Sequence, residues 1–312
     1  MTKRAVVVGI NNYTGIDPTG QSNLNACVAD AQSVAQLLTS SFGFDPANVT
    51  TILDTAATRS ALLAALTTMT NASQAGDVAF FYHSGHGTTI PDDPANPTCE
   101  KFYEVICTAT TPFLSDKDLW SVANRLQQSV VNFTVMLDSC HSGGLSQETD
   151  AVAKYRSIPF GSDLQQRLTQ YLTTLVPVGV GIPSSTDVCD NNVSNVNVTD
   201  DGILQCDEDP SRIFLDLAKM TLIAGCRFWE LSYEISGHGL MTQALLDTVD
   251  ASDFQISYGD LMTQLQTAVQ TTFTDQILPT VATNDPKSQT PQLRGQRNRM
   301  EEGFLQAWVQ SK

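Results

Sequence analysis

The chain has 312 residues, of which 41% are hydrophobic, and it carries a formal net charge of −16 at pH 7. This length suffices for a substantial core, in one large domain or two. Such a charge would repel nucleic acid and anionic membranes, which are therefore excluded as main partners, whereas cationic peptides are compatible with it. The sequence has no stretch of about 18 uncharged apolar residues, so no membrane span is expected.

The N-terminus and the cysteines indicate a cytoplasmic protein. The apolar run at residues 5–10 is too short for a signal peptide, and the following Gly-Ile-Asn-Asn is unlike a cleavage site. The seven cysteines are unevenly spaced and include no CxxC, so they form neither a disulfide framework nor a zinc-finger pattern. Cys189 and Cys206 flank an Asp/Asn-rich loop and could pair, but not in a reducing compartment.

The first part of the chain alternates between strands and helices. We expect strands at 4–10, 49–53 and 77–83, separated by helices at 26–42 and 58–69, because apolar residues recur there at strand-like or helical spacing. This alternation is typical of βαβ units that build a parallel sheet.

The remainder is predicted to add an extended piece at 103–108, a helix at 116–126, strands that start at 130 and 220, and helices at 239–249 and 258–273. Residues 147–210 are less regular. We expect one amphipathic helix near 164–175, followed by a stretch low in hydrophobic residues that reads as a long surface insertion.

The apolar run that starts at residue 130 is typical of a strand buried on both faces, and it ends in Asp-Ser-Cys-His-Ser-Gly-Gly. Open α/β sheets carry their chemistry just beyond the carboxyl ends of such strands. Cys140, in this turn, is therefore a candidate nucleophile. On Cys140 alone, a buried structural cysteine is an equally good interpretation.

A catalytic thiol needs a base that is close in space, and the strand at 77–83 ends in a similar turn. His86 lies between two glycines of this turn and suits the role of the base. His83 ends the apolar run and is interpreted as a core histidine. His141 is adjacent to the thiol along the chain and is poorly placed to act as its base.

The turn HSGHG followed by DSCHSGG resembles the His and Cys motifs of metacaspases, which are caspase-like cysteine peptidases. The separation of His86 and Cys140 agrees with the roughly 50 residues typical of caspases, although the QAC-type motif of true caspases is absent. The segments VVVGINNY, LNACVADA, GDVAFFYHSGHGT, LIAGC and QTPQL also follow the metacaspase order.

The resemblance implies an α/β fold, a caspase-like three-layer sandwich in which a mostly parallel central sheet of about six strands has helices on both faces. It also implies one peptidase domain. Residues 1–146 would be the part that resembles the large subunit, 147–210 an insertion or linker, and 211–312 the part that resembles the small subunit.

The resemblance also implies roles for single residues. Cys140 would be the nucleophile and His86 the base, and the backbone amides of Gly85 and Cys140 would form the oxyanion hole. Asp30, Ser84 and Asp138 would line an acidic pocket that accepts Arg or Lys through charge-assisted hydrogen bonds. Without the resemblance, Asp30 would be interpreted as an ordinary exposed carboxylate at a helix start.

No cofactor is required for this chemistry. Calcium-dependent metacaspases carry a run of adjacent aspartates, which is interrupted here as Asp116-Lys117-Asp118, and this argues against the family calcium site. A few residues beyond the Cys motif, where the family has an acidic residue, this chain has Gln147, followed by Glu148. The Asp/Asn-rich loop at 187–209 lacks EF-hand spacing and reads as a solvated loop.

The sequence therefore predicts a cysteine endopeptidase that cleaves proteins or peptides after Arg or Lys. The insertion, with Lys154, Arg156 and Arg167, is hypothesised to be cleaved by the enzyme itself or to gate the pocket. Two alternatives are a catalytically silent caspase-like regulatory or binding protein, and a zinc-binding protein that would use His83, His86, Cys140 and His141.

Overall fold

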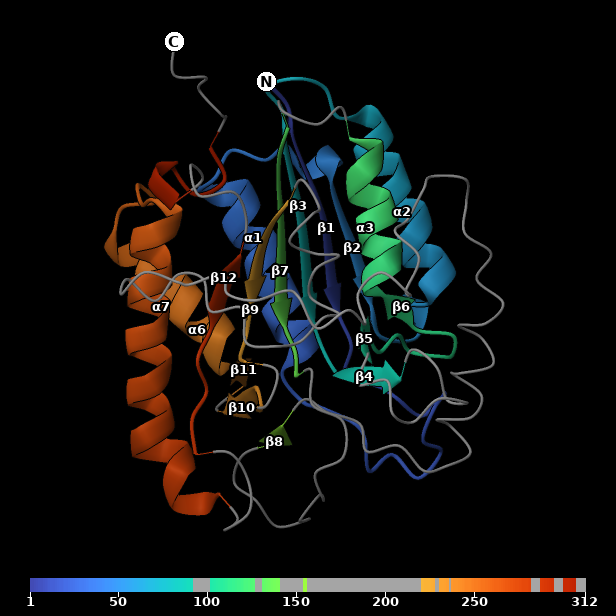
Figure 1. The fold of residues 1–312 in the computed structure, drawn as a ribbon, viewed down its shortest axis with the longest axis vertical. Coiled ribbons are helices and arrows are strands. Elements are labelled where there is room, and N and C mark those ends of the chain that lie inside the picture. The colour runs from blue at the N-terminus through green and yellow to red at the C-terminus, as the bar shows by residue number, and fades with distance from the viewer. Residues whose placement is uncertain are drawn as a thin grey trace, which may run out of the picture.

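The computed structural model describes residues 1–91, 102–126, 131–140, 154–155, 220–227, 230–235, 237–281, 287–294 and 300–306. A six-stranded sheet of order β12-β9-β7-β3-β1-β2 forms the centre of the molecule (Figure 1). Its strands are β1 (Lys3–Gly9), β2 (Val49–Leu53), β3 (Val78–Ser84), β7 (Asn132–Asp138), β9 (Thr221–Ala224) and β12 (Gln292–Arg294). All neighbours pair in parallel except β12, which is antiparallel to β9.

Helices cover both faces of this sheet (Figure 1). One face carries α1 (Cys27–Ser40), α6 (Leu240–Ala251) and α7 (Tyr258–Thr272), and the other carries α2 (Arg59–Ala72) and α3 (Asp116–Arg125). Short 3₁₀ turns lie at Pro46–Asn48, Asp54–Ala56 and Leu278–Thr280, and a π turn at Phe273–Ile277. The predicted three-layer α/β fold with a mostly parallel sheet of six strands is confirmed.

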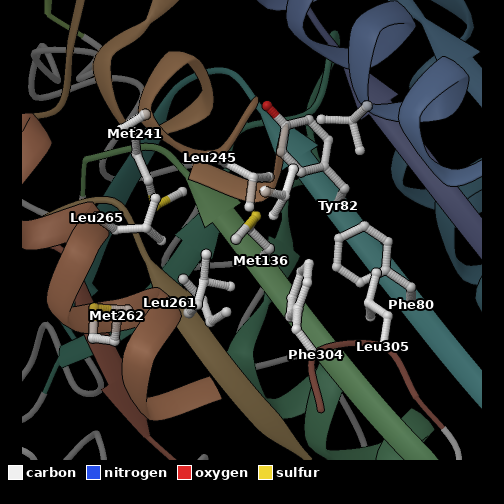
Figure 2. Close-up of a cluster of buried hydrophobic side chains, with 14 of the residues drawn as sticks. Phe80, Tyr82, Met136, Met241, Leu245, Leu261, Met262, Leu265, Phe304 and Leu305 are labelled. Carbon is white, nitrogen blue, oxygen red and sulfur yellow. The ribbon is translucent and has the colours of Figure 1, made fainter. Parts of the chain in front are cut away.

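Side chains of successive strand residues point to opposite faces, which divides the core in two. Phe80, Tyr82 and Met136 join the cluster under α1, α6 and α7, whereas Phe81 and Val135 join the cluster under α2 and α3. Figure 2 shows the first cluster, with side chains of β3 and β7 against those of α6 and α7. Because both faces are covered, the central strands read in the sequence as continuous apolar runs.

Two smaller sheets lie near the carboxyl ends of β3 and β7 (Figure 1). One contains β4 (Gly87–Pro91), β5 (Phe102–Ile106) and β6 (Leu114–Ser115), and the other contains β8 (Lys154–Tyr155), β10 (Tyr233–Ile235) and β11 (His238–Gly239). The chain thus adds two small sheets at the edge of the main sheet where the sequence predicts chemistry.

The short strands are the elements that the sequence pattern did not predict. β6, β8, β10, β11 and β12 have two or three residues each, too few for a periodic signal, and the five-residue β4 was not predicted either. The extended piece predicted at 103–108 is confirmed as β5. The helix predicted at 164–175 and the loop at 187–209 lie outside the described residues. In the described part of the chain, no helix is long and apolar enough to cross a membrane, and the cytoplasmic location stays a prediction.

A steric prediction concerns the contact that fixes α1 on the sheet. A methyl group on Gly9, at the end of β1, would clash with the carbonyl oxygen of Cys27 and would lie 2.7 Å from the Ala31 side chain. We expect Gly9→Ala to lower the free energy of unfolding by about 1–3 kcal/mol, as overpacked sites do. Urea denaturation measures this. Gln32→Ala, on the exposed face of α1, should change stability little, and equal stability of both variants would contradict the close packing.

Candidate active site

The predicted nucleophile and the predicted base each lie the same number of residues beyond the end of one of two neighbouring strands. Ser84 of β3 pairs with Asp138 of β7, and His86 and Cys140 each lie two residues beyond this pair. A methyl group on Gly87 would clash with the carbonyl oxygen of Cys140. The fold therefore places the main chain next to His86 directly against that of Cys140.

The Cys140 sulfur is held by a segment far away in the sequence. It is fully buried and accepts a hydrogen bond of 2.8 Å from the backbone N–H of Ser232. Ser232 itself precedes β10 and donates its hydroxyl to Asp138 Oδ1 at 2.7 Å. No local pattern points to Ser232, because nothing in its neighbourhood predicts a strand or a turn.

The His86 ring is oriented by a carbonyl group and an aromatic ring. Nε2 lies 2.7 Å from the carbonyl oxygen of Ser22, and the ring centroid lies 4.6 Å from that of Tyr13. The Tyr13 hydroxyl accepts from the His86 N–H at 2.7 Å and donates to the Cys107 carbonyl at 3.3 Å. A carbonyl oxygen can only accept, so the neutral ring carries its hydrogen on Nε2 and keeps Nδ1 as the proton acceptor.

The glycine turn differs from the predicted oxyanion geometry in one respect. The Gly85 N–H, predicted to face an oxyanion, points to the Asp138 carbonyl oxygen at 3.4 Å and extends the ladder between β3 and β7. Gly87 is the glycine that lies against Cys140. His83, interpreted as a core residue, is fully buried in β3 between Val8 and Leu137 of the neighbouring strands.

Asp30 is fully buried in α1, so its interpretation as an exposed helix-start carboxylate is wrong. Oδ2 accepts the Ser84 hydroxyl at 2.7 Å, and Oδ1 lies 2.8 Å from Nδ1 of His238. The N–H of Gly239, which caps the N-terminus of α6, reaches both carboxylate oxygens at 3.1 and 3.2 Å. The structure thus brings Asp30 and Ser84 together and adds His238 to them.

Asp138 is held by the same helix end. It is fully buried, and its Oδ2 accepts the hydroxyl of Thr242 at 2.6 Å and the backbone N–H of Thr242 at 3.1 Å. The Thr242 hydroxyl also lies 2.6 Å from that of Tyr82. Two buried carboxylates therefore meet the N-terminus of α6, where free N–H groups and the helix dipole favour negative charge.

The α1 helix is fixed in a similar way. No side chain of its own caps it; instead Asn11 Oδ1 accepts the N–H of Cys27 at 2.8 Å. Glu234 of β10, which is buried, accepts the N–H groups of Asn25 and Ala26 at 2.8 and 3.2 Å. Asp30 from α1 thus binds the start of α6, and Glu234, shortly before α6, binds the start of α1.

The loop before β10 is tied to the C-terminal tail. Glu230 is buried and accepts from the N–H groups of Arg227 and Thr290 at 3.1 and 2.6 Å. Gln289 accepts the N–H of Tyr233 at 3.0 Å and donates to the Gly225 carbonyl at 3.1 Å. These contacts fix the segment that carries Ser232, and they explain why the QTPQL segment belongs with the site.

The residues weighed as metal ligands have other roles where the structure describes them. Asp118 is paired with Arg59 at 2.6 Å and closes a capping box with Ser115 at the start of α3. His141 of the zinc alternative and Glu148 lie outside the described residues, as does the Lys117 side chain. Within the described ranges, no three His, Cys, Asp or Glu side chains gather in a way that could hold a metal ion.

A stability prediction follows from the buried Asp138. Thr242→Val keeps the shape of the side chain but removes the hydroxyl that Asp138 and Tyr82 share. We expect a loss of about 1–3 kcal/mol in the free energy of unfolding, because a buried acceptor loses a donor. Urea denaturation with Thr271→Val, an exposed threonine of α7, as the matched control checks this. Equal effects of the two changes would contradict the contact.

Comparison with known proteins agrees with this geometry. Residues 2–300 match the family model for the caspase domain. Metacaspase-4 of Arabidopsis thaliana is 31% identical over 153 residues, which are 47% of this chain and 35% of that protein. Metacaspase-9 of the same plant is 34% identical over 149 residues, 45% of this chain and 43% of that protein. The matched part thus spans less than half the length of these curated relatives.

Solved structures show the same fold. Protein GSU0716 from Geobacter sulfurreducens aligns with a TM-score of 0.62 at 22% identity, over 99% of this chain and 100% of that one. Caspase-1 from Spodoptera frugiperda aligns with a TM-score of 0.52 at 10% identity, over 94% and 88%. The resemblance predicted from the motifs is confirmed, and the chain belongs to the caspase-domain family of cysteine peptidases, with metacaspases among its relatives.

Proposed function

We propose that the protein is a cysteine endopeptidase that cleaves after Arg or Lys. The observation that carries this proposal is the matched placement of Cys140 and His86, each two residues past the paired ends of β3 and β7. The sulfur accepts the Ser232 N–H, and the imidazole is oriented by the Ser22 carbonyl. Two neighbouring strand ends that carry a thiol and an oriented imidazole at matching positions support a histidine-activated cysteine nucleophile.

In the proposed mechanism, His86 Nδ1 takes the proton of the Cys140 thiol. The thiolate then attacks the scissile carbonyl, and the imidazolium returns the proton to the leaving amine. The resulting thioester is hydrolysed by water, with His86 again acting as base and then as acid. The Ser22 carbonyl stabilises the imidazolium by accepting its Nε2 hydrogen, which keeps the ring orientation through both steps.

The oxyanion would be held by the backbone amide of Cys140 and by an amide of the glycine turn. The sequence suggests Gly85 for the second donor. In the structure this N–H points to the Asp138 carbonyl at a long 3.4 Å, so it would have to turn to reach an oxyanion. Gly87, whose backbone lies against the Cys140 carbonyl group, is a second candidate for this donor.

Selectivity for Arg or Lys is supported by the carboxylates of Asp30 and Asp138. Both are buried beside Ser84, where desolvated charges discriminate strongly for a cationic partner. In the present state Asp30 accepts from His238, whose side chain is 25% exposed. We infer that a substrate guanidinium or ammonium displaces this imidazole, because it is the exposed donor among the partners of Asp30 described above.

A fluorogenic peptide series with Arg, Lys or Asp at the cleaved position tests the proposed function. We expect cleavage after Arg and Lys, none after Asp, and none at all by Cys140→Ala. Asp30→Asn should lower kcat/KM for the Arg peptide roughly tenfold to a hundredfold, since a hydrogen bond to a charged group contributes about 1.5–3 kcal/mol. Asp247→Asn, an exposed carboxylate on α6, is the matched control. Preference for Asp would overturn the pocket assignment, and full activity of Cys140→Ala would overturn the mechanism.

Self-processing within the 147–210 insertion is supported by strand β8. Tyr155 pairs with Tyr233 and Lys154 with Glu234, antiparallel to β10. β10 directly follows Ser232, whose N–H contacts the nucleophile. The residue that follows Tyr155 in the sequence is Arg156. Arg156 and Arg167 lie outside the described residues. We propose that the enzyme cleaves its own chain after Arg156.

Prolonged incubation followed by N-terminal sequencing of the fragments tests this site. We expect a fragment that begins at Ser157, absent from Cys140→Ala and lost in Arg156→Gln, because a neutral side chain cannot pair with the buried carboxylates. Arg167→Gln should leave that fragment unchanged. The same fragments from Cys140→Ala would mean that another protease makes the cut, and self-processing would be wrong.

A further inference from the structure

Three buried thiols surround the end of β7, and the proposed mechanism uses one of them. The side chains of Cys107, Cys140 and Cys226 are free thiols, and each is at most 1% exposed. Cys226 directly follows the end of β9, the strand next to β7.

The sheet register brings Cys226 to the nucleophile. Leu137 pairs with Ala224, and the Gly225 N–H continues the ladder to the Leu137 carbonyl at 2.8 Å. Carried further, this register sets Cys226 opposite Ser139, one step away from Cys140. Residues one step out of register on adjacent strands have Cα atoms roughly 6 Å apart, which is within the range of about 4.4–6.8 Å that a disulfide spans.

Side-chain contacts agree with this placement. Cys226 Sγ lies 3.8 Å from the Ser139 carbonyl oxygen and 3.5 Å from that of Glu230. A hydrogen bond with Cys140, together with burial and the nearby charges of Cys140, Glu230 and Asp138, raises the pKa of the Cys226 thiol well above its usual value. Cys226 therefore stays protonated at neutral pH, and its thiol reaches the main chain of Ser139, the residue before the nucleophile.

Cys107 is the weaker partner. Burial and then the charge of Cys140 raise its pKa, without a hydrogen bond between the two sulfurs among the causes. Its N–H donates to the His86 carbonyl at 3.0 Å, and it packs in the hydrophobic cluster on the other side of the sheet from Cys140. The geometry thus distinguishes one neighbouring thiol from the other.

We propose that Cys140 and Cys226 form a reversible disulfide when a peroxide oxidises the nucleophile, which switches the peptidase off and protects it from further oxidation. The bond itself does not depend on the function proposed above; only its effect on catalysis does. Disulfides of this kind in a reducing compartment are typically transient and act as redox sensors.

The chemistry proceeds in two steps. The Cys140 thiolate attacks the peroxide, so that an S–O bond forms, the O–O bond breaks, and hydroxide leaves when the peroxide is hydrogen peroxide. The Cys226 sulfur then attacks the sulfenic acid: the S–S bond forms, the S–O bond breaks, and the departing hydroxide leaves as water with the Cys226 proton. Two electrons pass from the two thiols to the peroxide, and a dithiol reductant reverses the change.

The first step also prepares the second. Oxidation of Cys140 to a neutral sulfenic acid removes any negative charge on that sulfur, and such a charge is one of the causes that raise the pKa of the Cys226 thiol. The burial of both sulfurs favours a small oxidant such as hydrogen peroxide over a bulky disulfide such as oxidised glutathione.

The test uses the full chain, reduced, desalted and treated with hydrogen peroxide before alkylation of the remaining thiols. Peptide mapping by mass spectrometry should show a reducible link between the peptides of Cys140 and Cys226. Peptidase activity should be lost in parallel and return with dithiothreitol. In Cys226→Ser, we expect Cys140 to reach the sulfinic acid, and the lost activity not to return. Cys107→Ser is the matched control and should behave like the unmutated chain.

Oxidation of Cys140 in the unmutated chain without this link would overturn the proposal, as would a link to Cys107. Full recovery of Cys226→Ser after peroxide would overturn the protective role. The peptide map of the unmutated chain needs no variant, so a variant that fails to fold leaves the test intact. A link in a protein without peptidase activity would refute the proposed function and not the disulfide.

Discussion

The structure depends on buried acids that bind the N-termini of two helices. Asp30 of α1 and Asp138 of β7 accept N–H groups of Gly239 and Thr242 at the start of α6. In return, Glu234 of β10 accepts N–H groups at the start of α1. Each carboxylate would be costly in a dry interior without such donors. Here the helix ends supply hydrogen bonds and a favourable dipole, so the charges fix the two helices against the strand ends.

The contacts of these buried carboxylates also determine where the proposed catalytic groups lie. The strands deliver Cys140 and His86, but the groups that orient them come from elsewhere: the Ser232 N–H for the sulfur and the Ser22 carbonyl for the imidazole. Ser232 is fixed because its hydroxyl binds Asp138 and because Gln289 donates to it at 3.3 Å. The geometry of the site therefore forms only when the N-terminal, central and C-terminal parts of the chain pack together.

The features predicted correctly from the sequence are those that depend on residues close together along the chain. Long apolar runs predicted β3 and β7, and the glycine-bearing turns after them predicted where His86 and Cys140 lie. Nothing local predicted β10, which has three residues, or the roles of Ser22, Ser232 and His238, because those roles exist only through long-range contacts. Asp30 shows the limit most clearly: its position in a helix gave no sign of its burial, and only the family resemblance placed it with Ser84, while His238 and Gly239 were not expected beside it.

The position of β9 between β7 and β12 in the central sheet has a consequence for a chain cut within the insertion. The two pieces would share one sheet and the hydrophobic clusters on both of its faces, and the Ser232–Cys140 contact would join them without a peptide link. Such a product would remain a noncovalent heterodimer. Its unfolding would become a dissociation whose midpoint rises with protein concentration, as for any complex in which subunits fold on each other.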